Sequence, residues 1–158
     1  MNDTAMRTVS ALIRRGWTVS FAESCTGGMA CSRLVDVPDA SKVLNASFVT
    51  YANEAKTALL GVREETLEQH GAVSEETAFQ MAEGVCRASG ANVGVGITGI
   101  AGPGGGTDEK PVGTVCFGFS VNGTTETVTK HFGALGRTQV RRAAVDFVFE
   151  ALCDKLER

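Results

Sequence analysis

Residues 17–35 read WTVSFAESCTGGMACSRLV, and the pattern changes within this stretch. The apolar run 17–22 predicts a strand, and residues 29–35 belong to a predicted helix. The segment between them, AESCTGG at 22–28, therefore forms a strand-to-helix turn. Such a unit is typical of layered α/β domains.

Two nucleophile types, Ser24 and Cys25, lie on this turn. Free backbone N–H groups and the positive end of the helix dipole meet there, and these are good conditions for stabilising a developing oxyanion. The plainer interpretation is that Ser24 or Thr26 caps the helix, while Gly27 and Gly28 allow a tight turn. For the turn taken alone, the plainer interpretation is favoured.

The rest of the chain alternates between helical and strand patterns. Helices are predicted over 4–15, 27–36, 53–60, 64–70, 75–89 and 137–156, and strands over 17–22, 43–52, 93–98, 113–121 and 124–132. The Asn122-Gly123 turn favours a β-hairpin formed by the last two strands. We therefore expect residues 1–158 to form a single three-layer α/β/α domain whose mixed sheet includes one β-hairpin.

The composition of the 158-residue chain limits its partners. A net charge of −3 and a pI of about 5.4 argue against broad electrostatic binding to nucleic acid or to anionic membranes. No signal peptide is visible, and no apolar run is long enough to cross a bilayer. The five cysteines form no CxxC, which is typical of reduced thiols, so we expect a cytoplasmic protein without nucleic-acid or membrane partners.

Two glycine-rich segments follow residue 93. The first, GVGITG at 94–99, matches the dinucleotide fingerprint GxGxxG, but it lies in a predicted strand and opens no helix, so we discount it. The second, GIAGPGGGT at 99–107, offers successive N–H groups that wrap an anion or let a ligand approach the backbone. Its plain alternative is a solvent loop without a ligand.

A serine nucleophile needs a base, and histidine is scarce. His70 and His131 lie in no motif, and no cluster of His, Cys and carboxylates has metal-ligand spacing, so we expect neither a metal nor another cofactor. Lys56 is the alternative base, because the first turn of a helix and burial both lower a lysine pKa. From the pattern alone, a solvated surface lysine is the stronger interpretation.

The last helix opens with two cations. Arg137 and Arg141 lie four residues apart on one face of its first turns. Positive charge at a helix N-terminus is disfavoured, so an anion nearby would relieve it. The plain alternative is a surface position with ordinary ion pairs.

Taken together, these segments resemble the CinA C-terminal domain family, which includes stand-alone nicotinamide-nucleotide amidases of the PncC type. The resemblance rests on AESCTGG at 22–28, YANEAK at 51–56, LGV at 60–62, GAVSEE at 71–76, TGIAGPGGGT at 98–107, KPVGTV at 110–115, and Gly136-Arg137 followed by Arg141. These strings occur in family order and cover nearly the whole chain. The pyrophosphatase activity of the N-terminal domain that larger members carry is not implied for this domain.

The resemblance implies hydrolysis of the carboxamide of nicotinamide mononucleotide, without a cofactor, to nicotinic acid mononucleotide and ammonia. Ser24 would attack the amide carbon and Lys56 would accept its proton. Tyr51 would orient the lysine or contact the pyridine ring, with packing in the core as an equal alternative. The oxyanion, ribose and phosphate would be held by residues of the turn, the glycine-rich loop and the last helix: Cys25, Thr26, Gly27, Gly28, Thr98, Gly99, Gly102, Gly104, Gly105, Thr107, Arg137 and Arg141.

Several alternatives remain open beside this reading. Ala52 stands where the family often has serine, which removes one hydroxyl but none of the proposed groups, and Cys25 keeps a thiol nucleophile open. The function could instead be nucleotide binding or interaction without turnover, linked to competence or DNA damage, or hydrolysis of another small amide. Family members often form dimers or higher assemblies, so a homo-oligomer is expected.

Overall fold

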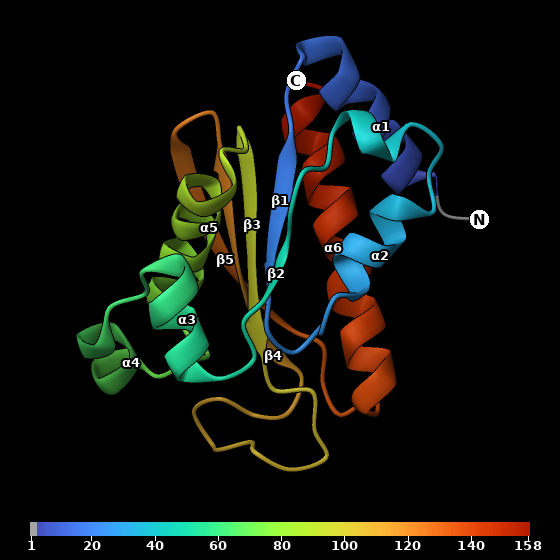
Figure 1. Cartoon of the computed structure of the whole chain (residues 1–158). Coiled ribbons are helices and arrows are strands. Elements are labelled where there is room, and N and C mark those ends of the chain that lie inside the picture. The colour runs from blue at the N-terminus through green and yellow to red at the C-terminus, as the bar shows by residue number, and fades with distance from the viewer. Residues whose placement is uncertain (1–2) are drawn as a thin grey trace.

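The strand predicted over 17–22 forms as β1 and lies between β2 and β3 in the sheet. The computed structural model describes residues 3–158, and Figure 1 shows a twisted sheet with helices on both faces. The sheet has the order β2-β1-β3-β4-β5. Its strands are β1 (Val19–Glu23), β2 (Phe48–Val49), β3 (Val93–Gly99), β4 (Thr114–Val121) and β5 (Thr124–His131).

The sheet is mixed, as predicted. β1 runs parallel to β2 and β3, whereas β4 runs antiparallel to both of its neighbours, β3 and β5. The turn between β4 and β5 has positive φ angles at both central residues, 48° at Asn122 and 93° at Gly123, as a type I′ hairpin turn requires. The expected hairpin is therefore confirmed.

Helices cover both faces of the sheet and make three layers (Figure 1). One layer contains α1 (Thr4–Arg15), α2 (Met29–Val35) and α6 (Arg137–Leu156), and the other contains α3 (Asn53–Leu60), α4 (Glu64–His70) and α5 (Glu75–Ser89). A short 3₁₀ helix spans Ala40–Lys42. The α/β/α prediction is confirmed.

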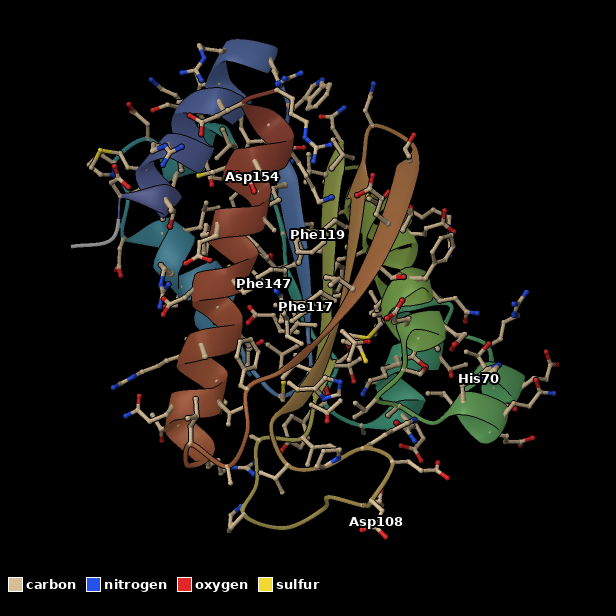
Figure 2. The ribbon with its side chains drawn as sticks, turned by 180° about the vertical axis from the view of Figure 1, so that it is seen from behind. His70, Asp108, Phe117, Phe119, Phe147 and Asp154 are labelled. Atoms are coloured by element: carbon tan, nitrogen blue, oxygen red, sulfur yellow. The ribbon has the colours of Figure 1, made fainter. Side chains whose placement is uncertain are left out.

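The two faces of the sheet are packed differently. Aromatic rings fill the space under α6, where Figure 2 shows Phe117, Phe119 and Phe147 together, with the Phe117 and Phe147 ring centroids 4.7 Å apart. On the opposite face α5 lies almost on the backbone of the sheet. A Cβ added at Gly96 would come within 2.6 Å of the Ala78 carbonyl oxygen. Two glycines of the GxGxxG string, Gly94 and Gly96, therefore allow the close packing of α5.

The long strand predicted over 43–52 is wrong. Only β2 and a single bridge between Leu44 and Val19 form there. Side-chain bonds replace the ladder between them: Ser20 Oγ donates to the Ala46 carbonyl, and the Phe21 N–H donates to Ser47 Oγ. Because the Ser47 hydroxyl takes a donor that a strand backbone would otherwise accept, the chain departs from the sheet at this point.

The direction of the strands places the candidate residues at one edge. β1, β2 and β3 are parallel, so their carboxyl ends meet at the same end of the sheet. In Figure 1 the glycine-rich loop after β3 and the N-terminus of α6 lie at this end too. Ligands of open α/β sheets bind outside the carboxyl ends of the strands.

Candidate active site

Ser24 and Lys56 meet although 32 positions separate them. The strand β1 ends one residue before Ser24, and Lys56 lies at the end of the first turn of α3. The Lys56 Nζ atom is 3.3 Å from Ser24 Oγ and 3.0 Å from each of the Thr50 and Tyr51 carbonyl oxygens. Lys56 is only 1% exposed, so it is not the solvated surface lysine of the plainer interpretation.

The surroundings of Lys56 favour the neutral amine. Burial lowers the pKa of Lys56 from its usual 10.5, and the nearby Cys25 and Glu54 oppose this shift. No carboxylate forms an ion pair with Lys56 among residues 3–158. As an ammonium, Lys56 donates to Ser24 Oγ and to the two carbonyls; as a neutral amine it keeps two N–H groups for the carbonyls and offers its lone pair to the Ser24 hydroxyl. The same three neighbours therefore fit both protonation states.

A buried carboxylate that the sequence analysis missed organises the turn. Glu23 is fully buried, and its side chain accepts hydrogen bonds from Thr26 Oγ1 at 2.6 Å, from the Ala30 N–H at 2.9 Å and from the Cys31 N–H at 3.0 Å. Its carboxylate thus caps α2, whose own N-cap residue, Gly28, supplies no side chain. The sequence did carry a signal for this role, because the acidic Glu23 precedes the N-cap glycine of α2 by five residues.

Several N–H groups expected to be free are engaged. The Gly27 N–H donates to the Ser24 carbonyl at 3.1 Å, and the Met29 N–H donates to the Thr26 carbonyl at 3.0 Å. In the described part of the chain, the N–H groups of Thr26 and Gly28 have no partner. These two remain available to a substrate oxygen.

Cys25 is poorly placed for attack. The side chain is 6% exposed, and burial raises the pKa of its thiol to about 11, so it is protonated at neutral pH. Its carbonyl accepts a hydrogen bond from Arg141 Nε at 2.9 Å, and the Thr26 carbonyl accepts one from the same guanidinium at 3.1 Å. Arg141 of α6 therefore fastens the turn from the helical layer that also contains α2.

Arg137 joins two other candidate segments. Its guanidinium donates to the Gly102 carbonyl at 2.7 Å and to the Tyr51 hydroxyl at 3.0 Å. Tyr51 is 59% exposed, so it does not pack in the core. The chain after β2, the glycine-rich loop and the start of α6 are thus connected at the edge that carries Ser24.

The remaining predicted residues lie farther out or have structural contacts. Thr98 is buried, and its hydroxyl donates to the Ala72 carbonyl at 2.8 Å. Gly104, Gly105 and Thr107 lie in the exposed part of the loop, whose outer turn carries Asp108 (Figure 2). The Thr107 hydroxyl accepts from the Lys110 N–H at 3.0 Å. Gly99 is the last residue of β3, where the loop begins.

The two histidines have partners away from Ser24. His70 faces Glu76 at 3.6 Å, and His131 Nδ1 is 3.3 Å from the Thr114 hydroxyl. Across residues 3–158, no group of three His, Cys, Asp or Glu side chains is arranged to hold a metal ion. None of the helices described here combines the length and apolar character needed to cross a membrane.

Known proteins are similar to this chain in sequence and in fold. The family model of the CinA C-terminal domain matches residues 1–156. A CinA-like protein of Kosmotoga olearia is 49% identical over 148 residues, which make up 91% of this chain and 36% of that protein. The chain spans about a third of the length of the curated relatives it matches.

Solved structures agree over nearly the full chain. The competence/damage inducible protein CihA of Agrobacterium tumefaciens superposes with a TM-score of 0.94 at 44% identity, covering 99% of this chain and 94% of that one. A CinA superfamily protein of Klebsiella pneumoniae has a TM-score of 0.94 at 39% identity and covers 99% of both chains. This chain belongs to the CinA C-terminal domain family.

Proposed function

We propose that this domain hydrolyses the carboxamide of nicotinamide mononucleotide, with Ser24 as nucleophile and Lys56 as general base. The observation that carries the proposal is the buried Lys56 amine, 3.3 Å from the Ser24 hydroxyl and held by two carbonyl oxygens. A nucleophile and a base within hydrogen-bond reach, with the base oriented by further groups, is the signature of covalent catalysis. A domain that only binds nucleotides has no need of such a pair.

Acylation follows from this geometry. The Ser24 oxygen attacks the amide carbon while the neutral Lys56 amine takes the hydroxyl proton. The amide oxygen becomes an oxyanion, for which the unpaired N–H groups of Thr26 and Gly28 are the available donors. The Lys56 ammonium then returns its proton to the amide nitrogen, the C–N bond breaks, and ammonia leaves.

Deacylation reverses these roles. Water attacks the acyl-enzyme and gives a proton to Lys56, and the ester bond to Ser24 breaks as its oxygen recovers that proton. The products are nicotinic acid mononucleotide and the free enzyme. No metal or other cofactor takes part in these steps.

The outer residues would hold the rest of the nucleotide. Tyr51 and Arg137, which already contact each other, border the edge where the pyridine ring and ribose would lie. The exposed glycine-rich loop would approach the phosphate with its N–H groups. The five unpaired cysteines fit a reducing cytoplasm, which is where we place this pyridine-nucleotide salvage reaction.

The test is release of ammonia and formation of nicotinic acid mononucleotide by the purified chain, with a chelator present. Ser24→Ala and Lys56→Ala should each abolish turnover, whereas Lys42→Ala, which removes an exposed lysine, should leave it unchanged. Turnover that survives Ser24→Ala would move the nucleophile to Cys25 or to an activated water. Binding without turnover by the native chain would favour the non-catalytic function. Turnover of other amides only would mean that nicotinamide mononucleotide is not the substrate.

A further inference from the structure

The two edges of the sheet differ in how they are protected. At one edge β2 is only two residues long, and the chain before it leaves the ladder. At the other edge β5 is eight residues long and pairs with β4 in continuous register from Val121↔Thr124 to Thr114↔His131. Figure 2 shows β5 in front, between α6 and α5, and no strand among residues 3–158 pairs with its outer side.

Such an edge normally requires protection. Proteins blunt exposed edge strands with proline, bulges, short length or charged side chains, because a free row of N–H and C=O groups recruits another strand. β5 contains neither proline nor a bulge. Its protection consists of two charged side chains on one face, which also have contacts within the chain: Glu126 accepts from Lys155 at 2.5 Å, and Lys130 lies 4.8 Å from the Phe147 ring centroid. These charges disfavour most strands, but a strand whose charges complement Glu126 and Lys130 can still pair with this edge.

The hairpin determines which backbone groups point outward. In a two-residue hairpin the residues that flank the turn, Val121 and Thr124, form a hydrogen-bonded pair. Bonded pairs then recur at every second residue, so Glu126, Val128 and Lys130 turn their N–H and C=O groups toward β4. The residues between them point their backbone groups to the outside: Thr125, Thr127, Thr129 and His131.

We propose that β5 pairs with β5 of a second copy of this chain, antiparallel and about a two-fold axis at Val128, so that the two sheets become one. In this register Thr127 lies opposite the partner's Thr129 as a bonded pair. Glu126 lies opposite the partner's Lys130 in a non-bonded pair, where facing side chains are closest. By symmetry each of these pairs occurs twice.

Other registers with outward groups bonded are less complementary. An axis at Glu126 or Lys130 places like charges opposite each other, which is destabilising. An axis at Thr127 or Thr129 leaves a charge opposite Val128. Only the axis at Val128 pairs opposite charges, so the strand is complementary to itself in one register.

An apolar side chain beside the edge fits the same occupant. Phe79 on α5 is 37% exposed and lines a groove with Glu75, Glu76, Gln80 and Thr127, next to the centre of β5. A second sheet joined at β5 brings the partner's α5, and with it the partner's Phe79, to the same side of the combined sheet. The strand edge and its apolar neighbour therefore form one continuous surface, close to the two-fold axis.

The experiment is a charge swap read by sedimentation over a concentration series of the full chain. Glu126→Lys and Lys130→Glu should each raise the dimer dissociation constant about tenfold or more, because two attractive pairs become repulsive. The double variant should restore it to within about threefold, since the pairs are reversed but again opposite. Glu65→Lys on α4, far from β5, is the matched control and should change nothing.

The outcomes are decisive in both directions. Thermal unfolding of each variant at low concentration checks that the monomer still folds without the Glu126–Lys155 contact. Weaker dimerisation of the single variants, with recovery in the double variant, supports the proposal. A native chain that stays monomeric overturns it and leaves the edge to a strand of a different protein. A dimer that ignores both single substitutions places the interface elsewhere and overturns it too.

Discussion

The turn after β1 and the loop after β3 border the same edge of the sheet, yet they are held in opposite ways. The turn is anchored from two layers, by the buried Glu23 carboxylate and by the Arg141 guanidinium. The loop is fastened at Gly102 by Arg137 and beside Lys110, whose amine donates to the His70 carbonyl at 2.7 Å, while its glycines between them are exposed. The anchoring contacts are thus concentrated around Ser24, the proposed nucleophile, and the loop that would contact the phosphate has fewer of them.

Among the substitutions near the anchored turn, Lys56→Met should have the largest effect on turnover. We expect turnover to fall by about 10²–10⁴ because the general base is gone. The two carbonyls lose their donor at about 1 kcal/mol each, but an amine no longer has to be buried, so the unfolding free energy should change little. Steady-state kinetics and thermal unfolding measure the two effects. Unchanged turnover in a folded variant would remove Lys56 from the mechanism.

The pH dependence tests the neutral state of Lys56. Since only the neutral amine accepts the Ser24 proton, kcat/KM should rise about tenfold per pH unit below the lysine pKa and level off below the usual 10.5. A profile that is still rising at pH 10.5 would contradict this.

The same lowered pKa has a stability consequence. The folded state binds this proton less tightly than the unfolded chain does, so the free energy of unfolding should rise with pH between the two pKa values. Lys56→Met should lack that rise. The Cys25 thiol, whose raised pKa acts with the opposite sign, is present in both proteins and cancels in the comparison.

Glu23→Gln weakens the anchor of the turn without touching Ser24 or Lys56. Glutamine offers one acceptor oxygen to three donors and turns an NH₂ group toward backbone N–H groups. We expect a loss of about 1–3 kcal/mol in the unfolding free energy and a fall of about tenfold in kcat. Glu68→Gln on the exposed surface of α4 is the control, and an equal effect there would show that position 23 is not special.

Glu23 also illustrates what the sequence could and could not predict. The layers, the hairpin and the six helices follow from periodicity and turn chemistry, which act over a few residues. Periodicity and turn chemistry do not show which distant segments come into contact. Lys56 looks like a solvated lysine in its own helix, and only the tertiary fold buries it beside Ser24.

The wrong strand at 43–52 has the same origin. Its apolar run is typical of a strand, but the hydroxyl of Ser47 competes for the Phe21 N–H, and local pattern does not show which bond forms. The resemblance to a family supplied the pairing of Ser24 with Lys56 that spacing could not. Glu23 belongs to the same motif, but its role appears only once three donors are seen to converge on it.

Arg137→Ala and Arg141→Ala compare the loop with the anchored turn directly. Arg137 is exposed and holds Tyr51 and Gly102, so its loss should raise KM several-fold and leave kcat within about twofold. Arg141 is half-buried and holds the two carbonyls of the turn, so its loss should lower kcat about tenfold. The reverse assignment of effects in steady-state kinetics would show that the loop, and not the turn, positions the reacting atoms.

The smallest effect comes from two neighbouring glycines of the loop. Gly105 has a φ of +88°, where an L side chain is strained by about 1–2 kcal/mol, whereas a Cβ at Gly104 meets nothing within 4 Å and has no such φ. Gly105→Ala should therefore distort the loop and raise KM a few-fold, and Gly104→Ala should change KM by less than about twofold. A strain of this size would lower the melting temperature of Gly105→Ala by about 2–8 °C, and Gly104→Ala should leave it nearly unchanged. KM is measured with nicotinamide mononucleotide. Equal KM values for both variants would mean that the loop conformation described here is not the one that contacts the substrate. Tyr51 would then be the next residue to test for contact with the substrate.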